Sequence, residues 1–263
     1  MARTIAALIA RGGSKRLPRK NVRDFCGLPL VAWTIIQTQS SRLIDEVWLS
    51  TDDDEIADIG RDFGAHVVRR PDWPDPDLIS GQRPTRHALE AAMEVGPVDC
   101  FVGALVTTPL RKPDDLDRLV AKFYVSDAPV VISVIPRREM NFREFVGEDT
   151  RAAIFDKSYR YCEVMGGNGA NNPQWFLDSC RTMTDESDAV LDAGGKAAAE
   201  AGAGPLLPYV AFEVWQQGDT DTIEEFELAE VKMEHYILKG RGRHVYDEYA
   251  DPYRDLVGNW RQL

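Results

Sequence analysis

Cysteine and histidine are scarce in this chain. The four histidines form no H-x-x-x-H pair, which argues against a histidine-based zinc site. The cysteines show no C-x-x-C spacing, and their wide separation indicates a reduced cytosolic chain with free thiols. They are Cys26, Cys100, Cys162 and Cys180.

Long apolar runs are also missing. No run approaches the roughly 18 residues that a membrane-spanning helix needs, so we expect no membrane partner. A short apolar stretch near the N-terminus is similar to the core of a signal peptide. It runs directly into Arg11, Lys15 and Arg16 without a cleavage-like segment. We therefore interpret it as a first β-strand and expect a cytoplasmic protein.

The chain lacks an excess of positive charge. Its formal net charge is −12, which argues against a nucleic-acid or anionic-membrane surface. The net charge does not exclude small anions as ligands, because a local cluster of cations can bind phosphate even in an acidic protein. The segment from Arg11 to Arg23 is such a cluster.

Apolar runs and helical spacing alternate along the first half of the chain. At 263 residues, with 44% hydrophobic residues, the chain fits a single domain over 1–263. The alternation predicts an α/β fold with a doubly wound, mostly parallel sheet and ligands beyond the carboxyl ends of its strands. We expect strands at 4–10, 45–51, 66–68, 100–106 and 129–134, and helices at 30–38, after the acids 52–54, at 82–93 and at 113–123.

The alternation breaks down between about 140 and 205, where glycine-rich stretches predict a small α+β insert with mobile loops. It resumes weakly at 209–216. Residues 222–239 then have the spacing of a long amphipathic helix. We expect its buried side to carry Phe226, Leu228, Ala229, Met233 and Ile237.

The loop after the first strand reads A-R-G-G-S-K-R-L-P-R-K-N (10–21). Gly12 and Gly13 let backbone N–H groups approach phosphate oxygens, and nearby arginines and lysines add charge-assisted hydrogen bonds. The spacing fits neither G-x-G-x-x-G nor G-x-x-x-x-G-K-[ST], which argues against an NAD(P)-dependent enzyme. The loop predicts a phosphate site, and the alternative is a solvated basic turn.

A carboxylate pair stands near the C-terminus in G-D-T-D-T-I-E-E-F (218–226). In an extended segment, residues two apart point the same way, so Asp219 and Asp221 can converge on one Mg²⁺ ion. The alternative is that Asp219, Thr220 or Asp221 caps the following helix, since D-T-x-x-E also suits a capping box.

These segments together resemble the acylneuraminate cytidylyltransferase family, which makes CMP-activated sugar acids. The family's A-R-G-G-S-K-G-x-x-x-K-N loop is matched except that Arg16 replaces a glycine, and R-L-P is similar to the related CMP-KDO synthetases. The resemblance continues through G-L-P-L (27–30), S-T-D-D (50–53), R-P (70–71), H-A-L-E (87–90), T-T-P-L-R (107–111) and the carboxylate pair. It covers about 3–135 and 205–236.

The resemblance implies a Rossmann-like nucleotidyltransferase that transfers CMP from CTP to an acidic acceptor, with Mg²⁺ as cofactor and pyrophosphate as product. It also implies a homodimer, whose contact and acceptor site we expect in the insert. The implied catalytic residues are Arg11, Lys20, Asp219 and Asp221, of which Asp219 and Asp221 bind metal. The implied nucleotide-binding residues are Arg11, Gly12, Gly13, Ser14, Lys15, Arg16, Lys20, Asn21, Arg70 and Ser80. For the acceptor we expect Asn168, Lys157 and Arg160.

Two departures from the family pattern fall on the acceptor side. Leu105 stands where the family has a glutamine, and N-G-A-N-N (168–172) keeps the asparagine but loses a tyrosine. The acceptor is therefore a sialic acid, another sugar acid or a small phosphonate. GTP or UTP as donor, and a non-catalytic sugar-nucleotide-binding protein, stay open as alternatives. Every version requires the N-terminal turn and the C-terminal carboxylates to face one ligand.

Overall fold

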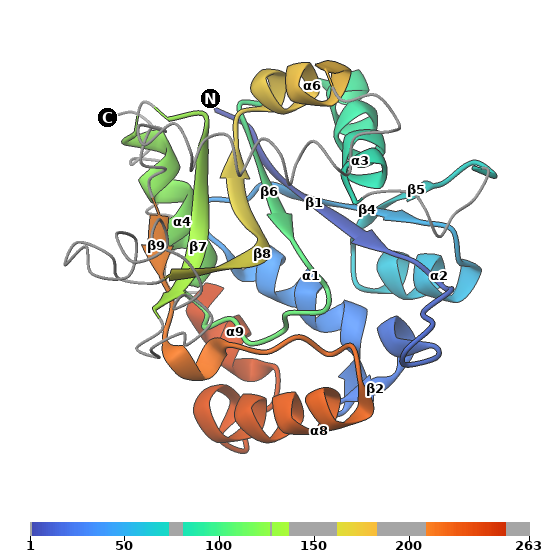
Figure 1. Ribbon diagram of the computed structural model, residues 1–263, viewed down its shortest axis with the longest axis vertical. Helices are drawn as coiled ribbons and strands as arrows, with labels where there is room; N and C mark the ends of the chain where they lie inside the picture. The colour runs from blue at the N-terminus through green and yellow to red at the C-terminus, as the bar shows by residue number, and fades with distance from the viewer. Residues whose placement is uncertain (1, 74–80, 127, 137–161, 183–208, 251–263) are drawn as a thin grey trace, which may run out of the picture.

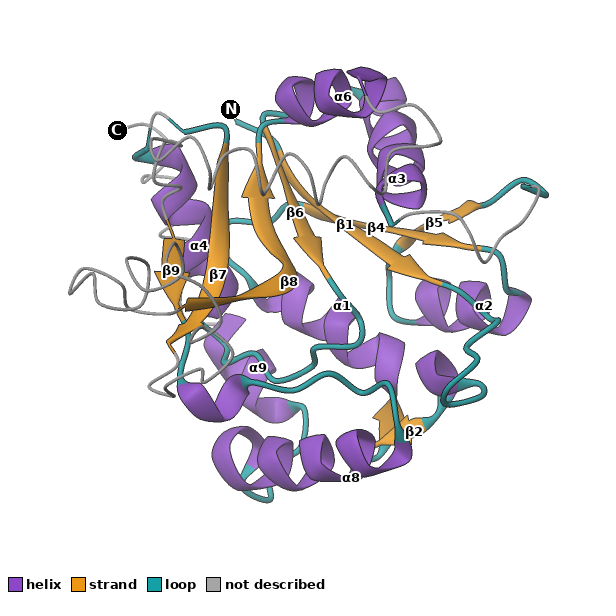
Figure 2. Ribbon diagram, viewed as in Figure 1, coloured by secondary structure: helices purple, strands orange, loops and turns teal. Residues whose placement is uncertain are grey.

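The computed structural model describes residues 2–73, 81–126, 128–136, 162–182 and 209–250. The strands within these ranges are β1 (Thr4–Ala10), β2 (Asp24–Phe25), β3 (Leu28–Pro29), β4 (Glu46–Thr51), β5 (His66–Arg69), β6 (Cys100–Ala104), β7 (Val130–Pro136), β8 (Cys162–Asn171) and β9 (Tyr209–Ala211). Among the described residues, seven of them form one sheet in the order β5-β4-β1-β6-β8-β7-β9, and β2 pairs with β3. All neighbours in the large sheet are parallel except β8, which is antiparallel to both β6 and β7 (Figure 2).

Helices cover both faces of this sheet (Figure 1). The α-helices are α1 (Leu30–Ser40), α2 (Asp54–Asp62), α3 (Gln82–Val95), α4 (Asp115–Tyr124), α6 (Pro173–Thr182), α8 (Ile223–Lys232) and α9 (His244–Ala250), with short 3₁₀ turns η1 (Lys20–Val22) and η3 (Val214–Gln216). Side chains of α1, α4, α8 and α9 share one buried cluster, whereas α3 and α6 share another on the opposite face. The predicted doubly wound α/β architecture is confirmed.

The central strand β1 explains the unbroken apolar run at the start of the chain. Ile5 and Ala7 pack in the cluster under α3, and Ala6 and Leu8 pack in the cluster under α1. Because successive side chains point to opposite faces, a strand covered on both sides needs apolar residues at every position. This burial holds the carboxyl end of β1, and the loop after it, in the middle of the sheet.

The segment expected to be an insert contributes to the main sheet. Within 140–205 the structure describes 162–182, where β8 lies between β6 and β7 and the α6 residue Phe176 packs edge-on against Phe101 at 5.0 Å between ring centroids. A glycine-rich strand buried between two neighbours shows no alternating pattern, and the sequence therefore did not predict it. The mobile loops that we expected, including the glycines at 194–204, lie outside the described residues.

The N-cap of helix α8 is one residue later than Asp221, the last of the predicted caps. Thr222 is its N-cap and accepts a hydrogen bond from the Glu225 N–H at 3.3 Å, while the Glu225 carboxylate accepts from the Thr222 N–H at 2.9 Å. The alternative that Asp219, Thr220 or Asp221 caps this helix is therefore wrong. A reciprocal capping box satisfies two N–H groups at the helix start without either aspartate.

The helical stretch continues from α8 through a π-helical turn, η4 (Met233–Leu238). Phe226, Ala229, Met233 and Ile237 are buried as expected, but Leu228 is 54% exposed. The expectation for Leu228 was wrong because a residue two positions after Phe226 is turned about 200° around the helix axis. The described helices include none that is both long and apolar enough to cross a membrane.

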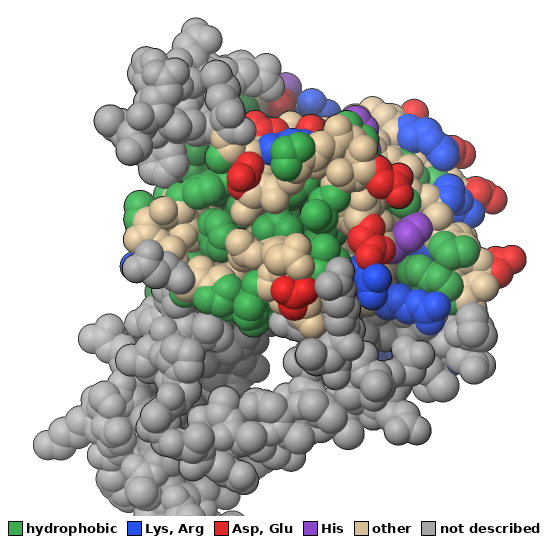
Figure 3. Space-filling view, turned by 90° about the horizontal axis from the view of Figure 1, so that it is seen from above, with side chains coloured by type: hydrophobic (Ala, Val, Ile, Leu, Met, Phe, Trp, Pro, Cys, Tyr) green, Lys and Arg blue, Asp and Glu red, His purple; other side chains and the backbone are tan. Residues whose placement is uncertain are grey.

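The surface mixes charges of both signs. Figure 3, which looks down on the molecule from above, shows basic side chains beside acidic ones, with apolar side chains between them. On α3, the exposed side chains of Arg86 and Glu90 form an ion pair at 2.7 Å.

Candidate active site

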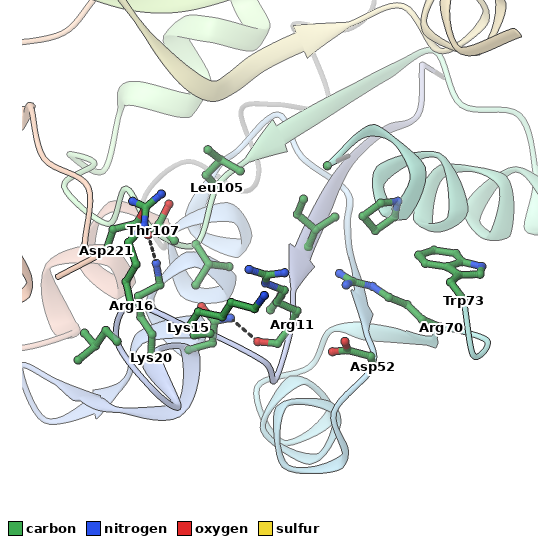
Figure 4. A pocket seen from close by; sticks show the side chains of 18 of the residues that line it. Arg11, Lys15, Arg16, Lys20, Asp52, Arg70, Trp73, Leu105, Thr107 and Asp221 are labelled. Carbon is green, nitrogen blue, oxygen red and sulfur yellow. Dashed lines mark hydrogen bonds and ion pairs between the residues drawn. The ribbon is translucent and has the colours of Figure 1, made fainter. Parts of the chain in front are cut away.

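A cavity of about 650 Å³ lies at the carboxyl ends of β1, β4, β5 and β6 (Figure 4). The chain leaves β1 through α1 toward β4 on one side, and returns through α3 to β6 on the other side. Such a reversal opens a crevice between the loops, where α/β sheets bind ligands. The cavity is lined by Ile9, Ala10, Arg11, Ser14, Lys15, Arg16, Leu17, Lys20, Asn21, Asp52, Arg70, Pro71, Asp72, Trp73, Gly81, Pro84, Leu105, Val106, Thr107 and Asp221.

The turn after β1 is held in place by its own residues. Arg19 adopts a left-handed backbone conformation with φ of 57°, which starts η1, and its guanidinium pairs with Asp53 and Glu55 of the next βα unit. The Asn21 amide donates to the Arg11 carbonyl at 2.9 Å and closes the loop on itself. The turn therefore presents Arg11, Ser14, Lys15, Arg16, Lys20 and Asn21 to the cavity together, as predicted.

The C-terminal carboxylate meets this turn directly. Lys20 Nζ donates to Asp221 Oδ1, and Arg16 Nη1 donates to Asp221 Oδ2 at 2.5 Å. These contacts join residues about 200 positions apart in sequence, and Figure 4 shows all three side chains at one end of the cavity. The prediction that the N-terminal turn and the C-terminal carboxylate face one space is confirmed for Asp221.

The electrostatics of Asp221 follow from its two cations. Burial alone raises the pKa of this carboxyl, but the hydrogen bond and charge of Lys20, with the charges of Arg16 and Arg11, lower it overall. Lys20 is the buried partner, with 7% of its side chain exposed, against 28% for Asp221 and 72% for Arg16. The site is thus a fixed anion flanked by cations.

Asp219 lies elsewhere. It is exposed, does not line the cavity, and accepts a hydrogen bond from the N–H of Thr220 at 2.8 Å. The intervening Thr220 is fully buried, and its hydroxyl donates to the Thr107 carbonyl. The local chain therefore anchors at Thr220 and directs Asp221 into the cavity, while the role of Asp219 as a second metal ligand stays a prediction.

Gly12 has a structural role in the turn, and the expected approach of Gly12 and Gly13 to phosphate oxygens stays a prediction. The Gly12 N–H donates to Asp52 Oδ1 at 2.9 Å, and neither Gly12 nor Gly13 is among the residues that line the cavity. A Cβ at position 12 would lie 2.3 Å from Asp53 Oδ2. Gly12 is required because the start of α2 packs against it, and its amide does not face the cavity in this structure.

Arg70 forms the opposite end of the cavity. Its Nε donates to Ser50 Oγ at 3.0 Å and its Nη2 to the Ser50 carbonyl at 2.8 Å. Burial lowers the pKa of Arg70 to about 10, so the guanidinium keeps its charge at neutral pH. Trp73 lines the wall beside it, with its ring edge-on to His87 at 5.6 Å between centroids.

Several cavity residues were missed from sequence. Asp52 belongs to the S-T-D-D motif. The motif indicated a helix N-terminus, but it did not indicate that the Asp52 carboxylate accepts a hydrogen bond from the Gly12 N–H. Trp73 directly follows the Arg70 segment, and no motif marks it. Asn168, expected to bind the acceptor, is buried, does not line the cavity, and accepts a hydrogen bond from Arg111 at 2.7 Å. Ser80, Lys157 and Arg160, also expected in the site, lie outside the described residues.

The fold and the cavity define an α/β protein with a cationic turn after its first strand, at the carboxyl edge of its sheet. Residues 5–131 match the model of the cytidylyltransferase family. The CMP-N,N'-diacetyllegionaminic acid synthase of Legionella pneumophila is 32% identical over 243 residues, which cover 88% of this chain and 97% of that protein. A pseudaminic acid cytidylyltransferase of Campylobacter jejuni is 31% identical, over 60% of this chain and 69% of that protein. The chain belongs to the cytidylyltransferase family of enzymes.

Other relatives are matched only in part. N-acylneuraminate cytidylyltransferase B of Danio rerio is 31% identical over 56% of this chain, and the match spans about a third of that protein's length, 34%. Among solved structures, a CMP:2-keto-3-deoxy-manno-octonic acid synthetase complexed with CTP superposes with a TM-score of 0.65 at 17% identity. The superposition covers 90% of this chain and all of that one, and it shows a shared fold.

Proposed function

We propose that this chain transfers CMP from CTP to a sugar acid, with release of pyrophosphate. The observation that carries the proposal is the meeting of Lys20 and Arg16 with Asp221 inside one cavity. The cations are suited to bind phosphate oxygens, and the carboxylate beside them is suited to bind a hard cation. The relatives named for CMP synthesis and cytidylyl transfer supply the nucleotide and the acceptor class.

The proposed nucleotide lies along the cavity between its two ends. The triphosphate contacts Arg11, Lys15, Arg16 and Lys20, which neutralise charge on the β- and γ-phosphates as pyrophosphate leaves. The nucleoside lies toward Arg70 and Trp73, where a fixed guanidinium offers hydrogen bonds and an aromatic ring offers a packing surface. An acceptor oxygen attacks the α-phosphorus in line, and positioning with charge neutralisation supplies most of the acceleration.

The residues at the Asp221 end fit a divalent cation such as Mg²⁺. Mg²⁺ takes one or two carboxylates and fills its other positions with water and phosphate oxygens, and Asp221 supplies such a carboxylate beside the phosphate-binding turn. Among the described residues no group of three or more acidic, histidine or cysteine side chains forms a full metal cage. When bound, the ion polarises phosphoryl and acceptor oxygens as a Lewis acid. Asp221, with Asp219 as the predicted second ligand, would hold it.

The proposed acceptor binds on the side of the cavity that Leu105 lines. The resembled family has glutamine at this position, so an apolar side chain replaces a polar one there. Asn168 is in register with Ala104, the residue before Leu105, and Lys157 and Arg160 stay predictions. We infer a sugar acid of the pseudaminic or legionaminic type, because relatives named for these acids are matched over more than two thirds of their length. The resemblance also implies a cytoplasmic homodimer, and light scattering would test its mass.

A pyrophosphate-release assay across the four nucleoside triphosphates tests the donor. The acceptor panel contains N-acetylneuraminic, pseudaminic and N,N'-diacetyllegionaminic acids and a small phosphonate, each with Mg²⁺, and mass spectrometry identifies the product. We expect CMP-sugar acid from CTP alone. Product from GTP or UTP would replace the nucleotide, product from the phosphonate would replace the acceptor class, and tight CTP binding without any product would favour a nucleotide-binding protein.

A further inference from the structure

Arg111 is a deeply buried charged side chain next to the cavity. It follows the cavity loop 105–107 and is 1% exposed. Its Nε donates to Asn168 Oδ1 at 2.7 Å, and its Nη1 donates to Gln37 Oε1 at 2.9 Å. Its Nη2 donates to the Leu105 carbonyl at 2.6 Å and to Thr108 Oγ1 at 3.1 Å. Every arm of the guanidinium is therefore engaged.

All of these partners are neutral. Among the described residues, no carboxylate accepts a hydrogen bond from Arg111. Asp115 acts on Arg111 only through space, and its own carboxylate accepts from Gln216, the Lys112 N–H and Arg118. Burial lowers the pKa of Arg111 to about 10, which leaves it charged at neutral pH. Buried charges are normally paired, so an arginine with neutral hydrogen-bond partners, and with Asp115 acting only through space, keeps a positive field that no direct ion pair cancels.

The contact with Arg111 also decides how the Asn168 amide is turned. Nε of Arg111 is a donor, so the atom that faces it must be the amide oxygen, and Nδ2 must point away. Asn168 is 2% exposed, and its Nδ2 has no hydrogen-bond partner in the described part of the chain. A buried donor without an acceptor calls for a ligand or an ordered water.

A second buried polar group without a partner lies on the neighbouring strand. Val131 of β7 is in register with Ala170 of β8, and both are buried in the cluster under α1 and α4. Ser133 is in register with Val210 of β9 and Asn168 with Ala104 of β6, and both of these partners pack in the same cluster, so the two polar side chains face the same side of the sheet. Ser133 Oγ is buried without a hydrogen-bond partner among the described residues, and the register shifts beside it. β-Bulges of this kind often adjoin active sites.

We infer that Arg111 is a positioning residue for the acceptor: it turns the Asn168 amide so that Nδ2 donates to an oxygen of the sugar acid, and its buried charge favours the acceptor carboxylate at this end of the cavity. The inference rests on the proposed function. Leu105 contributes no polar side chain to the cavity, and Asn168 is in register with Ala104, the residue directly before it, so the unpartnered Nδ2 lies next to this loop. Because Nδ2 is shielded from solvent, the acceptor must displace part of the wall to reach it.

Asn168→Asp is the sharpest test because it is isosteric. The aspartate keeps an oxygen for Arg111 and gives that arginine a counter-ion, but it replaces the Nδ2 donor with an anionic oxygen. We expect the KM for the sugar acid to rise at least about tenfold, the KM for CTP to stay within about twofold, and the thermal midpoint to equal or exceed that of the wild type. An unchanged acceptor KM, or a joint rise of both KM values with a lower midpoint, would overturn the inference.

Variants of Arg111 separate positioning from charge. Arg111→Lys keeps the positive charge but loses the planar set of guanidinium donors, and Arg111→Met loses both. We therefore expect the acceptor KM to be lowest in the wild type, higher in Arg111→Lys and highest in Arg111→Met. Arg42→Met is the matched control, because Arg42 is a half-buried arginine paired with Asp117 at 2.6 Å and does not line the cavity. It should lower the midpoint without moving the acceptor KM. Equal effects of Arg42→Met and Arg111→Met on that KM would contradict the positioning role.

The activity of the wild-type chain distinguishes a failure of the proposed function from a failure of the role of Arg111. If it converts none of the acceptors in the panel with CTP and Mg²⁺, the proposed function fails. If the wild type is active and Asn168→Asp binds the same sugar acid equally well, the proposed function stands and the role of Arg111 fails.

Discussion

Replacing Asp221 by asparagine removes one charge from the point where the two ends of the chain meet. Lys20, with 7% of its side chain exposed, then lacks its ionic partner, whereas Arg16 is 72% exposed and returns to solvent. Breaking a fully buried pair costs about 3–5 kcal/mol, and an exposed pair is worth about 0–1 kcal/mol. Since Asp221 is 28% exposed, we expect a loss of about 2 kcal/mol. In a domain of this size that lowers the thermal midpoint by about 4–8 °C.

The same substitution has a defined pH dependence. The pKa of Asp221 is lowered in the folded chain from its usual 3.8. The ion pair therefore contributes its full stability above pH 3.8, and the contribution is lost as the pH falls through the folded pKa. The difference in midpoint between wild type and Asp221→Asn should be constant near neutrality and should disappear in acid.

Turnover should fall much more than stability. Losing the carboxylate that we propose as a ligand of the divalent cation would remove several kcal/mol of charge stabilisation, which corresponds to about 10²–10³-fold in rate. The assay is pyrophosphate release with CTP, Mg²⁺ and the sugar acid, at a temperature where both proteins are folded. Asp58→Asn is the matched control, since this carboxylate is 72% exposed, pairs with Arg61 and does not line the cavity. We expect its turnover to be unchanged. Near-normal turnover of Asp221→Asn, or an equal loss in Asp58→Asn, would refute the prediction.

Three further predictions concern the frame of the cavity. Gly12→Ala places a Cβ 2.3 Å from Asp53 Oδ2, and we expect a loss of about 1–3 kcal/mol in chemical denaturation; Gly13→Ala, with no atom within 4 Å, is the control and should be near neutral. Thr222→Ala removes the N-cap of α8, so we expect the free energy of unfolding to fall by about 1 kcal/mol. Nucleotide binding in calorimetry should also weaken, because Asp221 directly precedes the cap. An unchanged free energy of unfolding would show that the cap does not stabilise the chain. Burial and the charge of Arg70 lower the pKa of His87 from 6.5, so the unfolded chain takes up a proton first and stability should fall as the pH drops below 6.5 toward the folded pKa. In His87→Phe that pH-dependent loss should be smaller, and an unchanged profile would exclude His87 as its source.

The order of the elements could be predicted because burial leaves a periodic trace in the sequence. The strand at 4–10 is apolar at every position since helices cover both of its faces, and helix α2 begins after Asp53 because that side chain accepts the Ile56 N–H. Strand β8 left no such trace. Its small residues at 166–170 carry too little apolar pattern to reveal a strand inserted between two others, so its antiparallel place depends on tertiary pairing.

The candidate site was predictable in its chemistry and less so in its geometry. The cations of the turn at 11–21 stand out in an acidic chain, and they meet Asp221 as expected. Spacing alone made Asp219 and Asp221 equivalent, but the anchor at Thr220 distinguishes them. The partners of the Arg111 guanidinium come from three separate parts of the chain, and no local motif reports such a convergence.

The pairing of Lys20 with Asp221 has a consequence for biosynthesis. During synthesis the cationic turn is made first, and Asp221 follows only after roughly four fifths of the chain. The contact between Lys20 and Asp221 can therefore form only late in synthesis. Two more contacts tie the same ends, the edge-on rings of Phe25 and Phe226 and the hydrogen bond from the Cys26 N–H to Glu230. A truncated chain that stops before Asp221 therefore lacks the carboxylate that Lys20 and Arg16 contact at one end of the cavity.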